Sequence, residues 1–195
     1  MAGASMKDIK LRIKSVESTM QITKAMELVA SSKLRKAKER QERCRPYFMG
    51  LKQTLESIET ATNDFSSPYQ QQREIKKRCL IVIAGDRGLA GGYNSNVFKS
   101  VQPMLEEGSV CVLPIGKRTV DFFARNGIEM LTTEFAEAAS VSVSDCFTIS
   151  NLITKGYLNG QYDEVSVVYT RFVSMLTQTP AHDVLLPLEK LEGKA

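Results

Sequence analysis

The sequence predicts an α/β protein in which a long N-terminal coiled-coil helix precedes a Rossmann-like α/β domain with a mostly parallel sheet. Residues 7–59 are rich in strong helix formers and contain one glycine and one proline. A polar segment follows, and after it short apolar runs alternate with helix-like stretches. Alternating strands and helices are typical of a domain built around a parallel sheet.

The N-terminal stretch fits a 3.5-residue repeat that begins at Ile9. Twelve of its fifteen positions are apolar, which predicts a coiled-coil seam sustained over seven heptads. Thr23, Glu27 and Gln41 are the polar exceptions. The apolar positions, called the seam below, are Ile9, Ile13, Val16, Met20, Ala30, Leu34, Ala37, Cys44, Phe48, Leu51, Leu55 and Ile58.

A strict seven-residue repeat implies left-handed supercoiling. As one helix, this stretch would be roughly 75–80 Å long. Pro46 lacks a backbone donor, so we expect a kink or break near it.

The change of pattern predicts four regions: the coiled-coil helix at 1–59, a linker at 60–76, the α/β domain at 77–188 and a tail at 189–195. Helices are expected at 94–106, 118–125 and 144–158, the last capped by Ser144 or Asp145. Strands are expected at 79–84, 110–115, 128–132, 165–169 and 172–178.

A glycine-rich turn at residues 85–94 (GDRGLAGGYN) separates the first strand from the next helix. α/β proteins bind phosphates at such turns. The turn has no Gly-Lys-Ser/Thr ending, and the spacing of Gly85, Gly88, Gly91 and Gly92 is not GxGxxG. We therefore interpret the glycines as serving backbone geometry.

No residues of the sequence form a recognisable catalytic or metal-binding pattern. Cys44, Cys79, Cys111 and Cys146 are scattered, with His182 as the only histidine. A structural zinc site needs clustered ligands. The sequence thus predicts free thiols, no metal, no cofactor and no catalytic residue, although folding can assemble a site from distant segments.

A second apolar stripe, Ile22, Ala25, Met26 and Val29, lies off the seam. A helix that is apolar along a seam and also elsewhere is suited to touching two partners. The alternative is a core that widens locally within one bundle.

The basic run that follows consists of Lys33, Arg35, Lys36, Lys38, Arg40, Arg43 and Arg45. Residues 1–52 hold 13 Lys/Arg and 5 Asp/Glu, a net of +8, whereas the other 143 residues hold 13 and 17, a net of −4. A solvated helix face is the simplest interpretation, and nucleic-acid binding is the rival. Aromatic residues are absent from the basic run up to Arg45, and its charges spread around the helix, which disfavours nucleic acid.

The sequence contains no apolar run long enough to span a membrane and no secretory or transit signal, so a bacterial cytoplasmic protein is expected.

Three segments resemble ATP synthase gamma subunits. Residues 22–37 (ITKAMELVASSKLRKA) closely resemble that family's N-terminal helix signature, and residues 85–94 resemble the loop after the first strand of its α/β domain. Residues 185–188 (LLPL) are similar to the segment that closes the first half of that domain. The resemblance runs in consistent order from about residue 1 to residue 188.

The resemblance implies a central-stalk rotor without a catalytic site of its own, part of a proton-translocating ATP synthase on the cytoplasmic face of the bacterial plasma membrane. Its partners would be the alpha and beta subunits of F1, the epsilon subunit and the c-ring of F0. Rotation of the ring and shaft would drive each beta subunit through its nucleotide-binding states. The residues expected to face the alpha and beta subunits are Ile22, Lys24, Met26, Val29, Lys33, Arg35 and Lys36.

The family's C-terminal helix, which would pair with the seam, does not follow Ala195 in this sequence. We therefore expect a shortened form whose seam lacks its partner. Two alternatives from other classes are a nucleotide-binding α/β enzyme with a helical extension and a basic coiled-coil nucleic-acid binder.

Overall fold

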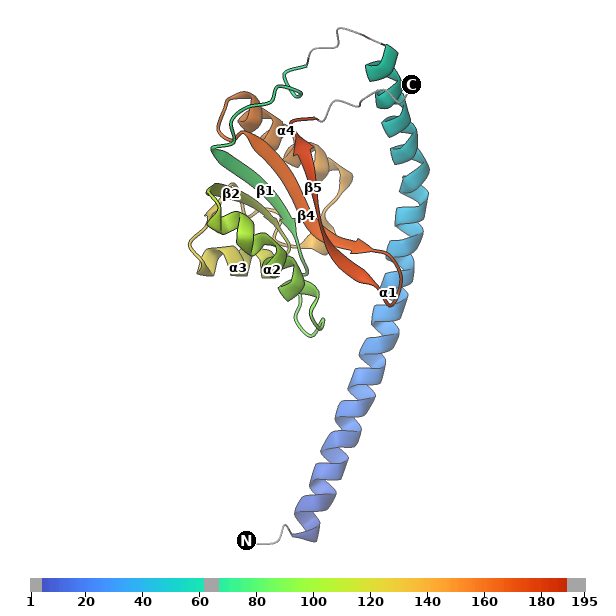
Figure 1. Cartoon of the computed structure of the whole chain (residues 1–195). Coiled ribbons are helices and arrows are strands. Elements are labelled where there is room, and N and C mark those ends of the chain that lie inside the picture. Colours follow the sequence, from blue (N-terminus) through green and yellow to red (C-terminus); the bar gives the residue numbers. More distant parts are fainter. Residues whose placement is uncertain (1–4, 62–66, 189–195) are drawn as a thin grey trace. The chain divides into compact units, whose positions relative to one another are not determined.

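The computed structural model describes residues 5–61 and 67–188. The chain divides into two units (Figure 1): one contains helix α1, and the other contains the sheet and the remaining helices. Each unit is described separately below.

Helix α1 spans Met6–Ala61, 56 residues. Its first turn is capped because the Lys7 backbone N–H donates to Ser5 Oγ and the Ser5 N–H donates to Asp8 Oδ2, both at 3.3 Å. The helix continues through Pro46, so the expected break there is absent. One proline removes a single backbone donor, and the helix formers on either side maintain the neighbouring turns.

The α/β unit is built on a five-stranded sheet in the order β3-β2-β1-β4-β5. Strands β1 (Lys77–Ile83), β2 (Ser109–Ile115), β3 (Glu129–Met130) and β4 (Glu164–Phe172) are parallel, and β5 (Gln178–Leu186) runs antiparallel to β4. The predicted α/β class with a mostly parallel sheet is confirmed.

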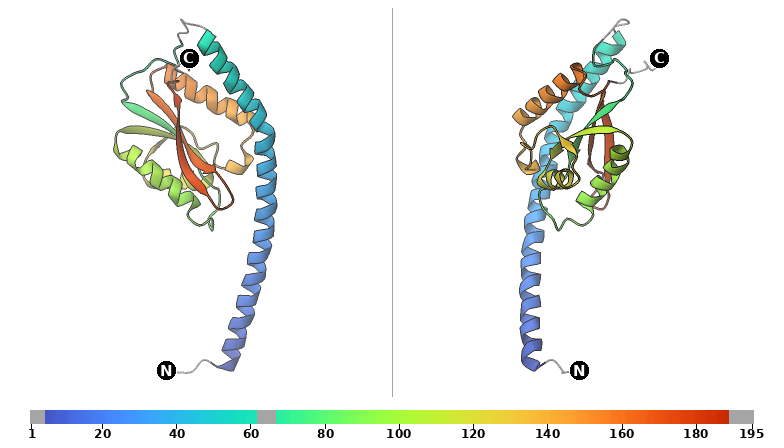
Figure 2. Two further views of the ribbon diagram at one scale, coloured as in Figure 1. Left: turned by 45° about the vertical axis from the view of Figure 1, so that its right-hand side comes forward. Right: turned by 90° about the vertical axis from the view of Figure 1, so that its left-hand side faces the viewer.

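Helices cover both faces of this sheet (Figure 2). Helices α2 (Tyr93–Glu106) and α3 (Lys117–Arg125) pack on the face that contains Leu80 and Val82. Helix α4 (Val143–Leu158) packs on the other face, against Cys79 and Ile81. Strand β1 is therefore buried on both sides, which explains why it is an unbroken apolar run.

The N-terminus of α4 differs from the expected cap. A short 3₁₀ helix, η1 (Ala138–Ser140), precedes α4, and Ser142 is the N-cap. The Asp145 N–H donates to Ser142 Oγ at 3.2 Å, and the Ser142 N–H donates to Asp145 Oδ2 at 2.7 Å. Asp145 is thus the third helical residue of a capping box, and the expected caps Ser144 and Asp145 both lie inside the helix.

The expected fifth strand at 172–178 is wrong. Phe172 ends β4 and Gln178 begins β5, so the residues between them form the turn of a β-hairpin. Val173 N–H and Ser174 N–H both donate to Thr177 O, which closes this turn. The turn contains apolar residues, and periodicity alone does not separate an apolar turn from a short strand.

Residues 67–76 are attached to the α/β unit. The Arg73 guanidinium donates to Tyr157 O at 3.0 Å and lies 4.7 Å from the Tyr157 ring centroid. The Tyr157 hydroxyl in turn donates to Gln71 O at 3.2 Å. This segment therefore holds the C-terminal end of α4.

Candidate functional site

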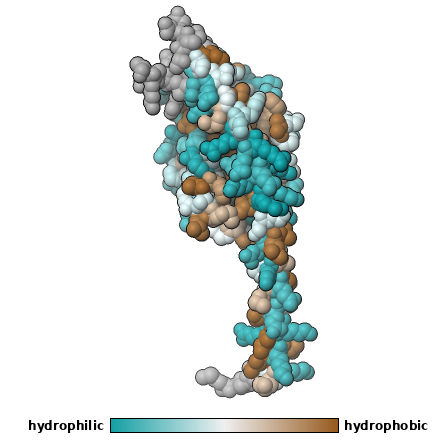
Figure 3. Space-filling model, turned by 90° about the vertical axis from the view of Figure 1, so that its right-hand side faces the viewer, coloured by the Kyte–Doolittle hydropathy of each residue, from teal (hydrophilic) through white to brown (hydrophobic). Residues whose placement is uncertain are grey.

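The seam of α1 is accessible to a partner. Its apolar residues are exposed, apart from the half-buried Leu34. Figure 3 shows apolar side chains alternating with polar ones along the N-terminal part of α1. An extended apolar stripe in water is a binding surface or an aggregation liability.

The second apolar stripe is also accessible. Ile22, Met26 and Val29 are each more than half exposed, and Ala25 and Lys24 are exposed with them. Their spacing of four and three residues places Ile22, Met26 and Val29 on one side of the helix. The structure therefore presents the stripe as a surface, and its contact with a partner stays a prediction.

The basic run lies in solvent. Arg35 Nε is 4.0 Å from Glu39 Oε1, and Lys38 Nζ is 3.8 Å from Glu42 Oε1, both as exposed pairs one helical turn apart. Such pairs contribute little to stability. Lys33 and Lys36 form no ion pair with any described residue, so their charges are available to an acidic partner.

Two polar side chains of the glycine-rich turn, those of Asp86 and Asn94, are hydrogen-bonded within the fold. Asp86 accepts hydrogen bonds from the backbone N–H groups of Ala138 at 2.8 Å, Ala139 at 3.2 Å and Lys117 at 3.3 Å. This carboxylate therefore joins the turn to η1 and to the start of α3. A phosphate loop instead points backbone donors at a ligand.

Asn94 holds the same turn from the other side. Its side-chain oxygen accepts from the Gly85 N–H at 2.8 Å, and its amide nitrogen donates to Arg87 O at 3.1 Å. At the tip, Leu89 and Gly91 have positive φ angles of 57° and 55°. The glycines and these two polar side chains together support a structural role for the turn.

All four thiols are free, but folding brings two of them together, Cys79 and Cys111, which are far apart in the sequence. Cys44 and Cys146 are exposed, whereas Cys79 and Cys111 are paired in register in β1 and β2 and are buried. The hydrogen bond with Cys111, together with burial, raises the pKa of the Cys79 thiol, which keeps it protonated and poorly nucleophilic. His182 is exposed on β5. Among the described residues, no group of three or more His, Cys, Asp or Glu side chains could hold a metal ion.

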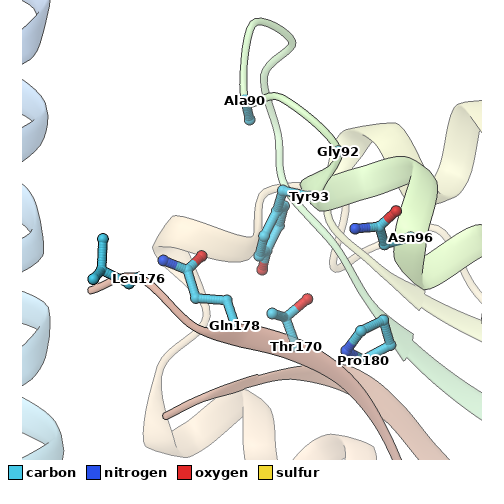
Figure 4. Close-up of a pocket in the computed structure, with 8 residues that line it drawn as sticks. All are labelled: Ala90, Gly92, Tyr93, Asn96, Thr170, Leu176, Gln178 and Pro180. Carbon is cyan, nitrogen blue, oxygen red and sulfur yellow. The ribbon is translucent and has the colours of Figure 1, made fainter. Parts of the chain in front are cut away.

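The sequence did not reveal that the side chains of Asp86 and Asn94 tie the glycine-rich turn to the rest of the fold. It also did not reveal a cavity lined by Tyr93, Asn96, Thr170 and Gln178 (Figure 4). These residues belong to α2 and to the β4–β5 hairpin, which are far apart in the sequence. Their spacing in the sequence does not show that they lie together, because that depends on the order of the strands in the sheet.

None of the described helices has the length and apolar composition needed to cross a bilayer.

Comparison with known proteins gives one consistent result. A family model described as ATP synthase matches residues 5–195. An ATP synthase gamma chain of Ruminococcus albus is 44% identical over 194 residues, which cover 97% of this chain and 68% of the relative. The gamma chain of Alkaliphilus metalliredigens is 45% identical over 193 residues, covering 98% of this chain and 66% of the relative. The chain thus spans about two thirds of the length of these relatives.

Among solved structures, a chain from the central stalk and c-ring of the Tetrahymena thermophila mitochondrial ATP synthase superimposes with a TM-score of 0.61. The match covers 85% of this chain and 72% of that one. Because the identity is 23%, it shows a similar fold and nothing about function.

Proposed function

We propose a rotor-shaft function for this chain, which belongs to the ATP synthase gamma chain family. In this proposal the chain couples rotation of a membrane c-ring to the conformational cycle of the catalytic beta subunits. The observation that carries the proposal is the surface of α1, a 56-residue helix with two accessible apolar stripes followed by a basic run. A shaft needs one surface for its own assembly and another for the subunits that surround it.

The proposed partners are those that the family implies, and the surfaces of α1 suit them. The stripe at Ile22, Met26 and Val29, with Lys24 beside it, would face the alpha and beta subunits. Lys33, Arg35 and Lys36 would lie near acidic segments of the beta subunits, since Lys33 and Lys36 have no carboxylate partner among the described residues. The α/β unit would contact the epsilon subunit and the c-ring, at the cytoplasmic face of a bacterial plasma membrane.

The proposal includes the absence of a catalytic site. The Asp86 carboxylate and the Asn94 carboxamide of the glycine-rich turn are hydrogen-bonded within the fold, and the Cys79 thiol is buried. Nucleic acid is not a proposed partner. The coupling ion is proposed to be the proton, although a gamma chain from Acetobacterium woodii that is 41% identical carries the name sodium ion specific.

Met26→Lys provides the test. In ATP synthase complexes assembled with the altered chain, we expect ATP-driven ion pumping into inverted membrane vesicles to fall at least several-fold more than ATP hydrolysis. A lysine at this position places a charge in a contact that should be apolar, and desolvating that charge is costly.

Gln21→Lys is the matched control, because Gln21 is exposed on α1 and lies outside both apolar stripes. It should leave the ratio of pumping to hydrolysis close to that of the unaltered complex. Normal coupling with Met26→Lys, or an equal loss with Gln21→Lys, would contradict the proposed contact.

A further inference from the structure

Folding places two of the four cysteines next to each other in the sheet. Cys79 is the third residue of β1 and Cys111 is the third residue of β2, and they are paired in register in these parallel strands. Both belong to the apolar cluster on the α4 side of the sheet, so their side chains point to the same face. Neighbouring strands lie about 4.8 Å apart, which is within the range of Cα separations that a disulfide spans. The backbone thus holds the two cysteines at a separation that allows a disulfide.

The two thiols form a hydrogen-bonded pair. The Cys79 thiol donates to Cys111 Sγ, and Cys111 Sγ lies 3.6 Å from Arg78 O, to which it donates in turn. Both thiols are free, and the proposed rotor function uses neither of them. Packing alone does not require two sulfur atoms to be in contact, so the pair is a candidate for thiol chemistry.

The two sulfur atoms differ in reactivity. The hydrogen bond from Cys79 lowers the pKa of the Cys111 thiol, and the charge of Lys77 acts in the same direction, while burial opposes both. The same hydrogen bond, together with burial, raises the pKa of the Cys79 thiol. Because the thiolate is the reactive form, Cys111 is the sulfur that reacts first with an oxidant, and Cys79 lies beside it to resolve the product.

The position of the pair limits the size of the oxidant. Both side chains are fully buried. Lys77 and Ser109 precede them by two residues and are paired with each other, and Ser109 is exposed while Lys77 is half-buried. The thiols therefore lie one layer of side chains below the surface, at the amino ends of β1 and β2. Brief opening of the strand ends admits an oxidant of nearly the size of water and excludes a larger one.

We propose that Cys79 and Cys111 form a disulfide when the chain meets hydrogen peroxide, and that this bond ties β1 to β2. The Cys111 thiolate attacks one peroxide oxygen, the O–O bond breaks, and the departing hydroxide takes up a proton, which leaves a sulfenic acid on Cys111. Cys79 Sγ then attacks Cys111 Sγ. The S–S bond forms, the S–O bond breaks, and the departing hydroxide takes the Cys79 proton. Two thiols and one peroxide thus give one disulfide and two water molecules. This inference goes beyond the rotor function and does not depend on it.

The test uses the full chain with Cys44→Ser and Cys146→Ser, which removes the two exposed thiols. After treatment of the folded chain with millimolar hydrogen peroxide, the tryptic peptides 79–87 and 100–117 should be joined by a bond that dithiothreitol cleaves. The oxidised chain should have a urea midpoint about 1 M higher than the reduced chain, because the bond closes a long loop. Oxidised glutathione, which is too large to enter, should give no joined peptides.

Two further variants in the same background assign the roles of the two sulfur atoms. With Cys79→Ser, the sulfenic acid on Cys111 should persist and be trapped by dimedone. With Cys111→Ser, Cys79 should react with peroxide about tenfold more slowly than Cys111 does in the first variant. Circular dichroism checks that both variants retain the fold. The joined peptides are measured with Cys79 and Cys111 intact, so that result stands even where a variant does not fold.

The proposal is overturned if peroxide joins the two peptides only after the chain has been unfolded in urea, or not at all. An unchanged urea midpoint after oxidation would contradict the tie between β1 and β2. Equal reaction rates of the two single thiols would overturn the assigned roles, and joining by oxidised glutathione as fast as by peroxide would overturn the limit on size. None of these outcomes bears on the coupling measured with Met26→Lys.

Discussion

Gly156 shows how a single residue sets the packing of α4. Tyr162 follows the helix and folds back across it, and its hydroxyl donates to Ile153 O at 2.8 Å. A Cβ on Gly156 would overlap the Tyr162 hydroxyl and ring. Both residues are buried, so neither has free space into which to move.

Gly156→Ala should therefore destabilise the α/β unit by about 1–3 kcal/mol, the usual cost of overpacking a core. Urea unfolding followed by tyrosine fluorescence measures the change. Gly108→Ala is the control, because an added Cβ there meets nothing within 4 Å. A loss no greater than that of Gly108→Ala would show that Tyr162 can shift without cost.

The capping box of α4 links stability to pH. Hydrogen bonds from the Ser142 side chain and backbone lower the pKa of Asp145. A carboxyl whose pKa is lowered by folding stabilises the native state above its unfolded pKa and loses that contribution as the pH falls through the folded pKa. The sensitive range therefore lies below about pH 4.

Asp145→Asn should lower the urea midpoint at pH 7 and reduce the further loss of stability as the pH falls below about 4. Asp163 accepts backbone hydrogen bonds from Lys76 and Lys77 and also has a lowered pKa, so part of the acid sensitivity should remain. Glu134→Gln, at an exposed carboxylate, is the control. An unchanged acid dependence in Asp145→Asn would show that the cap contributes nothing to stability.

At the scale of elements, α1 and β1 illustrate opposite sources of stability. Strand β1 is buried between helices on both faces, so its packing fixes it. Helix α1 has no fully buried side chain among the residues for which burial is described. It depends on local hydrogen bonds, capping and helix propensity, and long helices usually gain most of their stability from packing.

Pro46→Ala should therefore have a large effect on α1. Restoring one backbone hydrogen bond and removing the ring clash should stabilise the helix by up to about 3 kcal/mol. The expected result is a higher midpoint of the thermal loss of ellipticity at 222 nm. Gln41→Ala, at another exposed α1 position, should change it by a few tenths of that amount. Equal midpoints for the two variants would mean that Pro46 does not limit the helix.

At the scale of the whole molecule, the two units differ in whether a buried apolar core stabilises them. The α/β unit has an apolar core on each face of its sheet, whereas α1 contributes exposed apolar side chains. The charge differs as well, since residues 1–52 carry a net of +8 and the rest a net of −4. A chain of this kind need not unfold in one step.

We expect guanidinium unfolding of the full chain to give two transitions. Ellipticity at 222 nm should fall first as α1 melts, and tyrosine fluorescence should change later, because five of the six tyrosines lie in the α/β unit. Gly156→Ala should move only the later transition. Coincident transitions, or movement of both, would show that the two units unfold as one.

The sequence alone determined the fold class, the length and amphipathic character of α1 and the family. These features follow from local periodicity, composition and short motifs, and each of these can be seen in the sequence without knowing any tertiary contact. The strand order, the β4–β5 hairpin, the Ser142 cap and the ties made by Asp86 and Asn94 were decided by the tertiary structure. Each depends on which segments the sheet brings together, as does the convergence of Tyr93, Asn96, Thr170 and Gln178 on one cavity. Which residues from distant segments become neighbours is fixed only when the strands pair. Local sequence patterns therefore cannot predict these contacts.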